Sequence, residues 1–409
     1  MSARSVAAEV VRRVFEDGAY ADRAFRSAAG ALDARDRAFA QRLAYGTIQR
    51  VRTLDHAIET LGKRPVRKLD PPVRAALRVG AYQLAELDVP QHAAVNESVE
   101  LVRAAGLERA VGFTNAVMRR LSDGIRELIA TLPEGALKHS YPEWVDRVWT
   151  RDLGRDAALA LMRTQNEPPE TVVRWNARRG DVGVNLHHCV NARLDGELPN
   201  AVHVERVDEE ALAAGLIWPQ SRGSQLAGLC VGSVEGEQIL DLCAAPGGKA
   251  TQLAGEVTAV EKHPGRAREL EENCARLGAT NVKVVCADAL ELPDDLTGYD
   301  RAIVDAPCSG LGVLAARPDL RWRAEPLPDL QLALLRAAAE RVRAGGTIVY
   351  SVCTINADEN EAIVDESGLE VESLADAWPR YAHPRRPEFL LTLPHEHGTS
   401  GFFIARLRT

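Results

Sequence analysis

The sequence predicts a multidomain protein, with an all-α domain over residues 1–125, a small mixed α/β domain over residues 126–215 and an α/β domain over residues 216–409. Three observations predict this fold class. A chain of 409 residues is too long for one ordinary hydrophobic core. Apolar residues recur at helical spacing in the first part of the chain. In the last part, short β-rich runs alternate with helical segments, which is typical of a parallel, doubly wound sheet.

The first domain shows one amphipathic pattern after another and no alternating strand pattern. Apolar residues lie about one helical turn apart in two clear runs, namely Val6, Val10, Val14 and Val73, Leu77, Leu84. Breaks are expected at Asp17-Gly18, from Gly62 to Pro65 and at Pro71-Pro72, because glycine ends helices and proline opens them. The pattern therefore predicts several short helices.

The middle domain combines a helix near residues 155–164 with the short strands TVVRWN and AVHVERV. In the third domain the expected strands are QILDL, VTAVE, VKVVCA, RAIVD, GTIVYS and GFFIARL. The helices expected between them start at Lys249 and span residues 264–277 and 327–343. A sheet of this kind binds its ligand at the carboxyl ends of the strands. The Pro- and His-rich segment 379–398 is expected to be a long surface loop.

Composition and charge bound the function classes. No apolar run approaches the ~18 residues of a membrane span, and the N-terminus lacks the apolar core of a signal peptide, so we expect a cytoplasmic protein. Residues 1–125 carry 20 Lys and Arg against 15 Asp and Glu, a net charge of +5 within a total of −8, which leaves −13 for the remainder. This asymmetry favours phosphate contacts by the first domain, although an ordinary Arg-rich surface is the alternative.

The cysteines indicate neither a disulfide framework nor a zinc site. There are seven of them, an odd number, and none forms a CxxC pair. Four are expected to be small buried hydrophobic residues, namely Cys189, Cys230, Cys274 and Cys286. Cys308 and Cys353 require another explanation because each follows a predicted strand.

A ligand loop is predicted where the first strand of the third domain ends, in Asp241-Leu-Cys-Ala-Ala-Pro-Gly-Gly-Lys249. Small residues let the backbone approach a ligand, and a following helix would offer free N–H groups. Glu261 ends the next strand 20 positions after Asp241, where a carboxylate can bind both hydroxyls of a ribose, and Asp288 ends the third strand. The alternatives are a simple tight turn and carboxylates that cap the following helices.

Cys308 lies in Asp305-Ala-Pro-Cys-Ser-Gly after the fourth strand, and Cys353 follows the fifth. Both thiols are therefore expected at the edge of the sheet that carries the ligand loop, where nearby dipoles can hold a thiolate. Such a thiolate beside a methyl donor suits methylation of a pyrimidine, because addition to carbon 6 makes carbon 5 nucleophilic. Asp305, held protonated by burial or sharing a proton with the base, would stabilise the adduct at ring nitrogen 3.

Several ordered motifs resemble one known family. They are DLCAAPGGKA, then DAPCSGLGV followed by ARPDLRW, then YSVCT followed by ENEAIV, and finally SGFFIARL. They are similar to the motifs of the RsmB/NOP family of RNA cytosine-C5 methyltransferases, which includes the bacterial Sun/Fmu group. Residues 1–125 in turn look like a NusB-type helical RNA-binding domain. The resemblance implies a Rossmann-like class I methyltransferase domain, S-adenosylmethionine as cofactor and 16S ribosomal RNA as substrate.

The resemblance also implies residue roles. Cys353 would be the nucleophile, and Cys308 would help to release the enzyme from the methylated base. Lys249 would face either the cofactor or the RNA. Two positions depart from the family pattern: Val352 stands where Thr is usual before the nucleophile, and Ser221 where Asp is usual. The implied S-adenosylmethionine site consists of Cys243, Ala244, Ala245, Pro246, Gly247, Gly248, Lys249, Glu261, Asp288 and Asp305.

Arg321 and Trp322, in the loop that follows Cys308, are candidates for stacking on or clamping RNA. The alternative is that Trp322 covers the hydrophobic core. We expect a monomer that binds RNA, in particular unassembled 16S ribosomal RNA, and no membrane. Two other functions stay open. Transfer RNA as substrate would use the same catalytic residues, whereas a non-catalytic NusB-like antitermination factor would not need Cys308, Cys353 and Asp305.

Overall fold

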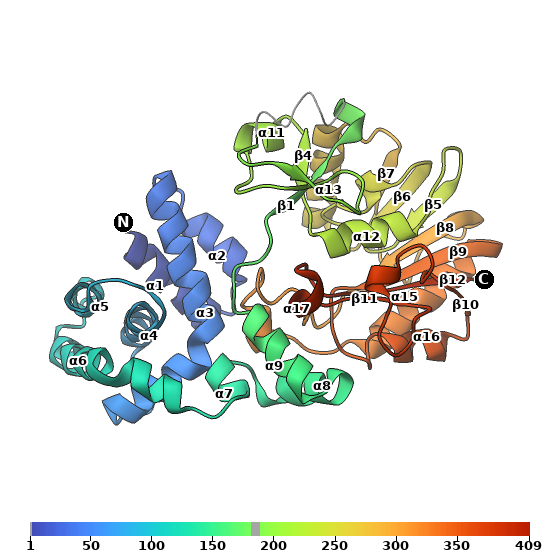
Figure 1. Cartoon of the computed structure of the whole chain (residues 1–409). Helices are drawn as coiled ribbons and strands as arrows, with labels where there is room; N and C mark the ends of the chain where they lie inside the picture. Colours follow the sequence, from blue (N-terminus) through green and yellow to red (C-terminus); the bar gives the residue numbers. More distant parts are fainter. Residues whose placement is uncertain (1, 181–188) are drawn as a thin grey trace. The chain divides into compact units, whose positions relative to one another are not determined.

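The computed structural model describes residues 2–180 and 189–409, which form two compact units (Figure 1). One contains the residues up to Glu167 together with Leu314–Arg323, and we call it the helical unit. The other contains Pro168–Val313 and Ala324–Thr409, and we call it the catalytic unit. Across the described residues, no helix is long and apolar enough to cross a membrane.

The helical unit confirms the all-α prediction. Its helices are α1 (Ala3–Glu16), α2 (Ala21–Ala28), α3 (Ala34–Gly62), α4 (Pro71–Glu86), α5 (Gln91–Ala104), α6 (Glu108–Thr131), α7 (Ala136–His139), α8 (Glu143–Leu153), α9 (Arg155–Thr164) and α14 (Leu320–Arg323). The expected breaks are present, because α1 ends before Gly18, α3 ends at Gly62 and α4 begins at Pro71. The expectation of short helices is wrong for α3, which has 29 residues, because its buried face continues without interruption.

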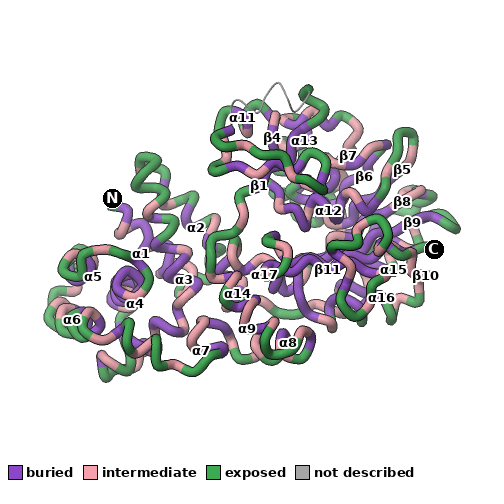
Figure 2. Tube along the Cα trace, in the orientation of Figure 1, coloured by how far each residue is buried: buried purple, intermediate pink, exposed green. Residues whose placement is uncertain are grey.

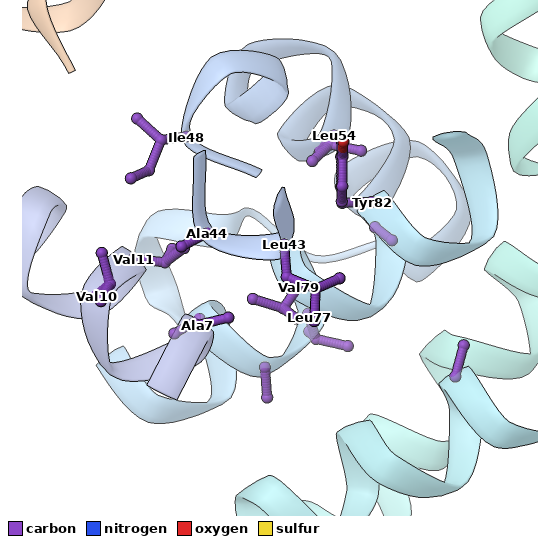
Figure 3. Close-up of a cluster of buried hydrophobic side chains, with 14 of the residues drawn as sticks. Ala7, Val10, Val11, Leu43, Ala44, Ile48, Leu54, Leu77, Val79 and Tyr82 are labelled. Atoms are coloured by element: carbon purple, nitrogen blue, oxygen red, sulfur yellow. The ribbon is translucent and has the colours of Figure 1, made fainter. Parts of the chain in front are cut away.

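The core of the helical unit is built from the predicted apolar faces. Side chains from α1, α3 and α4 gather in one cluster, including Val10, Leu43, Leu77 and Tyr82 (Figure 3). The helices α3 and α4 approach closely because Gly46 has no side chain: a Cβ there would lie 2.1 Å from the ring of Tyr82. Tight packing of this kind makes the position intolerant of larger residues.

The catalytic unit begins with a small antiparallel sheet in the order β2-β3-β1-β4. Its strands are β1 (Val172–Trp175), β2 (Arg193–Leu194), β3 (Ala201–His203) and β4 (Ile217–Pro219), with α11 (Glu209–Ala213) between the last two. They enclose a separate cluster around Val173, Trp175 and Val202. The predicted middle strands therefore exist, and they form a core of their own.

The large sheet of the catalytic unit has the order β10-β12-β9-β8-β5-β6-β7, with β11 beside β12. Its strands are β5 (Gln238–Asp241), β6 (Glu256–Glu261), β7 (Val282–Cys286), β8 (Tyr299–Asp305), β9 (Val342–Val352), β10 (Glu370–Glu372), β11 (Leu390–Thr392) and β12 (Phe402–Arg408). In Figure 1, α12 (Arg222–Cys230) and α13 (Pro264–Leu277) lie on one side of it, and α15 (Pro328–Arg341) and α16 (Glu361–Ser367) on the other. Figure 2 shows the central strands buried between these layers. This is the predicted doubly wound architecture.

Three local predictions are corrected. The sheet is mixed, because β12 runs antiparallel to β9 and β10. No long helix follows the ligand loop: only the single turn η4 (Ala250–Gln252) does. The segment 379–398 is not a surface loop, since it contains η5 (Pro379–Tyr381), β11 and α17 (Pro394–His397), and Phe389 is fully buried. Here tertiary burial outweighs the local signal of Pro and His.

Candidate active site

The carboxyl ends of the parallel strands bring the predicted residues to one edge of the sheet. Asp241 ends β5, Glu261 ends β6 and Asp305 ends β8, while Cys353 directly follows β9. The strand β5 lies between β6 and β8. The strands that follow β5 in sequence are therefore added first on one side of it and then on the other. Such a switch in strand order opens a crevice in which α/β proteins bind their ligands.

The loop after β5 is held in a defined shape by α13. Arg266 donates from Nη2 to the carbonyl of Ala245 at 2.8 Å, and Asn273 donates to the carbonyl of Pro246 at 2.9 Å. The peptide bond between Ala245 and Pro246 is cis. Gly247 has a φ of 106°, and a Cβ there would lie 2.7 Å from Leu270, so only glycine fits. The small residues of this loop therefore permit a conformation in which its backbone can approach a ligand.

Two of the predicted carboxylates differ in their environment. Glu261 is buried, accepts the backbone N–H of His263 at 2.9 Å and lies 3.4 Å from Nη1 of Arg266. Asp288 is more exposed and pairs with Lys262 at 2.6 Å, an interaction that lowers the pKa of Asp288. Both carboxylates accept a backbone N–H, so the alternative that they cap the following segments is partly confirmed. It leaves lone pairs of Glu261 available to a ligand.

A third carboxylate, Asp241, ends the first strand of the same series. It is buried, and its Oδ1 accepts the backbone N–H of Cys243 at 3.3 Å. Its Oδ2 is buried with no hydrogen-bond partner among the described residues. Burial, reinforced by the charge of Asp305, raises the pKa of Asp241 to about 7. An acidic residue that ends a buried strand was the sequence signal for this group.

The two predicted reactive thiols are in contact. The Sγ atoms of Cys308 and Cys353 lie 3.4 Å apart, and both side chains are half-buried. The hydrogen bond from Cys308 lowers the pKa of Cys353, and it raises the pKa of Cys308 together with burial. The pair therefore favours a thiolate on Cys353 and a thiol on Cys308. By contrast, burial raises the pKa of Cys243, which keeps that thiol protonated.

A buried cation completes the group. Lys249 pairs with Oδ2 of Asp305 at 2.6 Å, and Ser351 donates to Oδ1 of the same carboxylate at 2.9 Å. The ammonium of Lys249 also lies 5.2 Å from the ring centre of Phe402. Its positive charge helps to lower the pKa of Cys353. Both oxygens of Asp305 are therefore engaged, one by the ammonium of Lys249 and one by the hydroxyl of Ser351.

The proposed RNA clamp is corrected. Arg321 has no exposed surface, and its guanidinium donates only to groups within the helical unit. Trp322 donates from Nε1 to the carbonyl of Ile48 at 2.7 Å and packs against the helical core. The alternative interpretation, a Trp that covers the core, is therefore the right one. Arg321 lies two positions after the Pro318-Asp319 pair, and a charged residue beside such a pair gave no sequence signal of this burial.

The two departures from the family pattern have local explanations. Ser221 is the N-cap of α12, and its hydroxyl accepts the backbone N–H of Ser224. Serine and aspartate are both favoured at that position, so the cap is retained. Val352 is fully buried and pairs with Phe403 in the sheet, where a β-branched residue is favoured. Neither substitution removes a reacting group.

Comparison with known proteins agrees with this geometry. Residues 229–408 match the family model of the 16S rRNA methyltransferase RsmB/F, and residues 1–123 match that of the NusB family. A probable ribosomal RNA small subunit methyltransferase B from Synechocystis is 34% identical, with 100% of this chain and 99% of the relative covered. The chain belongs to the RsmB/F family. A probable methyltransferase B from Bacillus subtilis is 30% identical over 100% of this chain and 98% of its own.

Solved structures show the same fold as this RsmB/F enzyme. The crystal structure of PH0851 has a TM-score of 0.84 at 22% identity and covers 100% of this chain and 99% of its own. NSun6 from Pyrococcus horikoshii, solved with SFG, has a TM-score of 0.61 at 23% identity and covers 66% of this chain and 98% of its own. By the family model and the relatives, the RsmB/F enzyme is an RNA methyltransferase.

The residues at the strand ends fit S-adenosylmethionine, the cofactor that the sequence motifs imply. S-adenosylmethionine carries positive charge and hydrogen-bond donors, and Asp241 offers a buried carboxylate oxygen that lacks a partner among the described residues. The loop of small residues between Leu242 and Lys249 supplies close backbone approach, and Glu261 supplies a buried acceptor at the next strand end.

Proposed function

We propose that this enzyme methylates carbon 5 of a cytidine in 16S ribosomal RNA through a covalent bond between Cys353 and carbon 6 of the base. One observation carries the proposal: two thiols of unequal acidity lie 3.4 Å apart at the strand ends that also carry the cofactor loop. A methyltransferase that acts on a nitrogen or a hydroxyl needs no thiolate, whereas carbon 5 of cytosine must first be activated.

Each residue then has one step. The Cys353 thiolate adds to carbon 6, while Lys249 and Asp305 stabilise the charge that moves towards ring nitrogen 3. S-adenosylmethionine, when bound, supplies the methyl group to carbon 5. A base then takes the proton from carbon 5, the electron pair of that C–H bond re-forms the C5–C6 double bond, and Cys353 leaves carbon 6 as a thiolate. We assign the sulfur of Cys308 as this base, after its own proton has passed to solvent. Glu261 would hold the ribose of the cofactor, and the backbone after Ala245 its methionine part.

We assign the RNA substrate from chemistry and from the relatives. A cytidine must be swung out of any helix to reach a thiol in a crevice, which favours RNA that is not yet assembled. The relatives carry names as small subunit ribosomal RNA methyltransferases, and the NusB-family domain is a second RNA-binding element. Transfer RNA would use the same residues, so 5-methylcytidine should be mapped in both RNAs from cells without the protein. Loss of the mark in transfer RNA alone would overturn the ribosomal assignment.

The roles of the two thiols are tested by trapping. Cys353→Ala should abolish methyl transfer, on the order of 10⁴-fold or more, as for other catalytic nucleophiles. Cys308→Ala should accumulate a protein–RNA species that survives denaturing electrophoresis, because the adduct forms but is not resolved. It should form more slowly than in the wild type, since the hydrogen bond to Cys353 is lost. The double variant should give no adduct. If Cys353→Ala traps RNA and Cys308→Ala does not, the roles are reversed.

A further inference from the structure

The strongest feature that the mechanism leaves unused is the buried carboxylate of Glu359. Its side chain has 0% exposed surface. The Oε1 atom accepts the backbone N–H groups of Ser309 at 2.9 Å and Leu327 at 3.2 Å and the amide of Gln331 at 3.0 Å. Each of these donors is neutral. The carboxylate is thus fully desolvated and held by dipoles instead of a cation.

The second oxygen of Glu359 accepts two further hydrogen bonds, from the hydroxyl of Ser309 and from the amide of Asn356 at 3.2 Å. The hydroxyl of Thr354 lies 3.4 Å from the same oxygen but 2.7 Å from the hydroxyl of Ser309, so its single proton is donated to Ser309. Five donors on one carboxylate, with Thr354 joined through Ser309, make it the centre of a closed network.

This network joins the two segments that carry the thiols. Ser309 directly follows Cys308, and Thr354 directly follows Cys353. Ser309 bonds to Glu359 directly and Thr354 bonds to Ser309, so Glu359 holds the two thiol segments together beyond the end of the β8–β9 pairing. A displacement of either segment by 1 Å would break the 3.4 Å contact between the sulfur atoms.

The charge of Glu359 also acts unequally on the two sulfurs. It raises the pKa of Cys308, in addition to the hydrogen bond and to burial. The pKa of Cys353 is instead lowered by the hydrogen bond from Cys308 and by the ammonium of Lys249, while burial and the charge of Asp305 act in the opposite direction. A negative charge on the Cys308 side disfavours a second negative charge there, and the shared proton is retained by Cys308.

We propose that Glu359 is a positioning residue that fixes the two thiol segments against each other and, by its negative charge, keeps the proton on Cys308 so that Cys353 is the thiolate. It touches neither base nor cofactor in this assignment. The proposal rests on the proposed function for its meaning in catalysis, but the state of the thiols can be measured without RNA.

The test measures alkylation of the full chain by iodoacetamide from pH 6 to pH 10, with each cysteine peptide quantified by mass spectrometry. In the wild type, Cys353 should react faster than Cys308 at neutral pH, because the thiolate is the reacting form. Glu359→Gln removes the charge and keeps the shape, and the ratio of the two rates should fall about tenfold, as for a relative pKa change of one unit. Glu366→Gln, an exposed carboxylate on α16, is the matched control and should leave the ratio unchanged.

A second variant covers the case in which Glu359→Gln does not fold. Glu359→Asp keeps the charge but is too short to reach both Ser309 and Asn356, so kcat should fall about tenfold with an unchanged KM for S-adenosylmethionine. A wild-type ratio of alkylation rates in folded Glu359→Gln, or a wild-type kcat in Glu359→Asp, would overturn the proposal. If the ratio changes as expected but the wild type makes no 5-methylcytidine in any RNA, the proposed function fails and the role of Glu359 in the thiol pair stands.

Discussion

Arg321 in the helical unit and Glu359 in the catalytic unit are both charged side chains without exposed surface, and both are surrounded by neutral partners. The guanidinium of Arg321 donates five hydrogen bonds, to the carbonyls of Gln49, Ser140 and Gln165, to the amide of Asn166 and to the hydroxyl of Tyr141. Burial lowers the pKa of Arg321 to about 10, so the side chain is still charged at neutral pH.

The two sites differ in where their hydrogen-bond partners lie. The partners of Arg321 are backbone and side-chain groups of the helical unit, and they hold the segment Leu314–Arg323 in that unit. The partners of Glu359 lie beside the two thiols. The same physical solution, a buried charge satisfied by dipoles, thus serves architecture in one unit and the protonation of a reacting group in the other. Asp241 differs from both, since one of its buried oxygens lacks a partner among the described residues.

The largest effect is expected at Arg321, if its role is purely structural. Arg321→Ala removes five hydrogen bonds and leaves buried acceptors unpaired, so the helical unit should lose about 3–5 kcal/mol of stability. Thermal unfolding of the full chain, followed by circular dichroism, measures the change. Arg323→Ala, an exposed neighbour with one hydrogen bond to Gly18 and a contact with the ring of Tyr20, should cost less than about 1 kcal/mol. Equal effects of the two variants would break the comparison.

A smaller effect on ligand binding, with little effect on stability, is expected at Glu261. Glu261→Ala removes a carboxylate that is proposed to accept both ribose hydroxyls, a loss of about 1.5–3 kcal/mol for charge-assisted bonds. The Kd for S-adenosylmethionine should therefore rise roughly tenfold to a hundredfold by calorimetry. Glu256→Ala, at the exposed start of the same strand, is the control. An unchanged Kd in Glu261→Ala would remove this residue from the site.

Asp241 should produce a pH dependence of opposite sign to that of an ion-paired carboxylate. Its pKa is raised from 3.8 to about 7 in the folded protein, so the folded state binds the proton more tightly than the unfolded state. Stability is therefore highest at low pH and falls as pH rises to about 7, by on the order of 2 kcal/mol between pH 5 and pH 7. Asp241→Asn should abolish this part of the pH profile of thermal unfolding, whereas exposed Asp295→Asn should not. If the stability of Asp241→Asn and of the wild type depended on pH in the same way, burial would not raise the pKa of Asp241, and the prediction would be wrong.

The smallest effect is expected from exposed charge on the helical unit. Four exposed cations lie between α3 and α4, namely Lys63, Arg64, Arg67 and Lys68. If they contact phosphates, their combined replacement by Gln should weaken RNA binding about tenfold and lower the slope of log K against log salt by about 0.7 for each lost contact with single-stranded RNA. The measurement is a salt titration with the full chain. Wild-type binding that is indifferent to salt would instead make the helical unit a protein-interaction module.

Much of the site was predictable because its residues follow strands. Asp241 and Glu261 end strands, Cys353 directly follows one and Cys308 lies three residues beyond another, and parallel strands share one carboxyl edge. Sequence patterns indicated Asp241 as an acid at a strand end but left it out of the implied cofactor site, because the lack of a partner for Oδ2 is a property of the packed structure. They also placed Arg321 in contact with RNA, because a charged residue in a predicted loop normally faces solvent.

The sequence by itself determined the order of the elements, the helical nature of the first 125 residues and the family, because these depend on periodicity and on short motifs within one stretch of chain. Only the tertiary structure decided that Leu314–Arg323 belongs to the helical unit, that Lys249 pairs with Asp305 and that Glu359 joins both thiol segments. These contacts join residues that are distant in sequence or lie in different loops. Their free energy comes from burial and hydrogen bonding that exist only once the chain has packed.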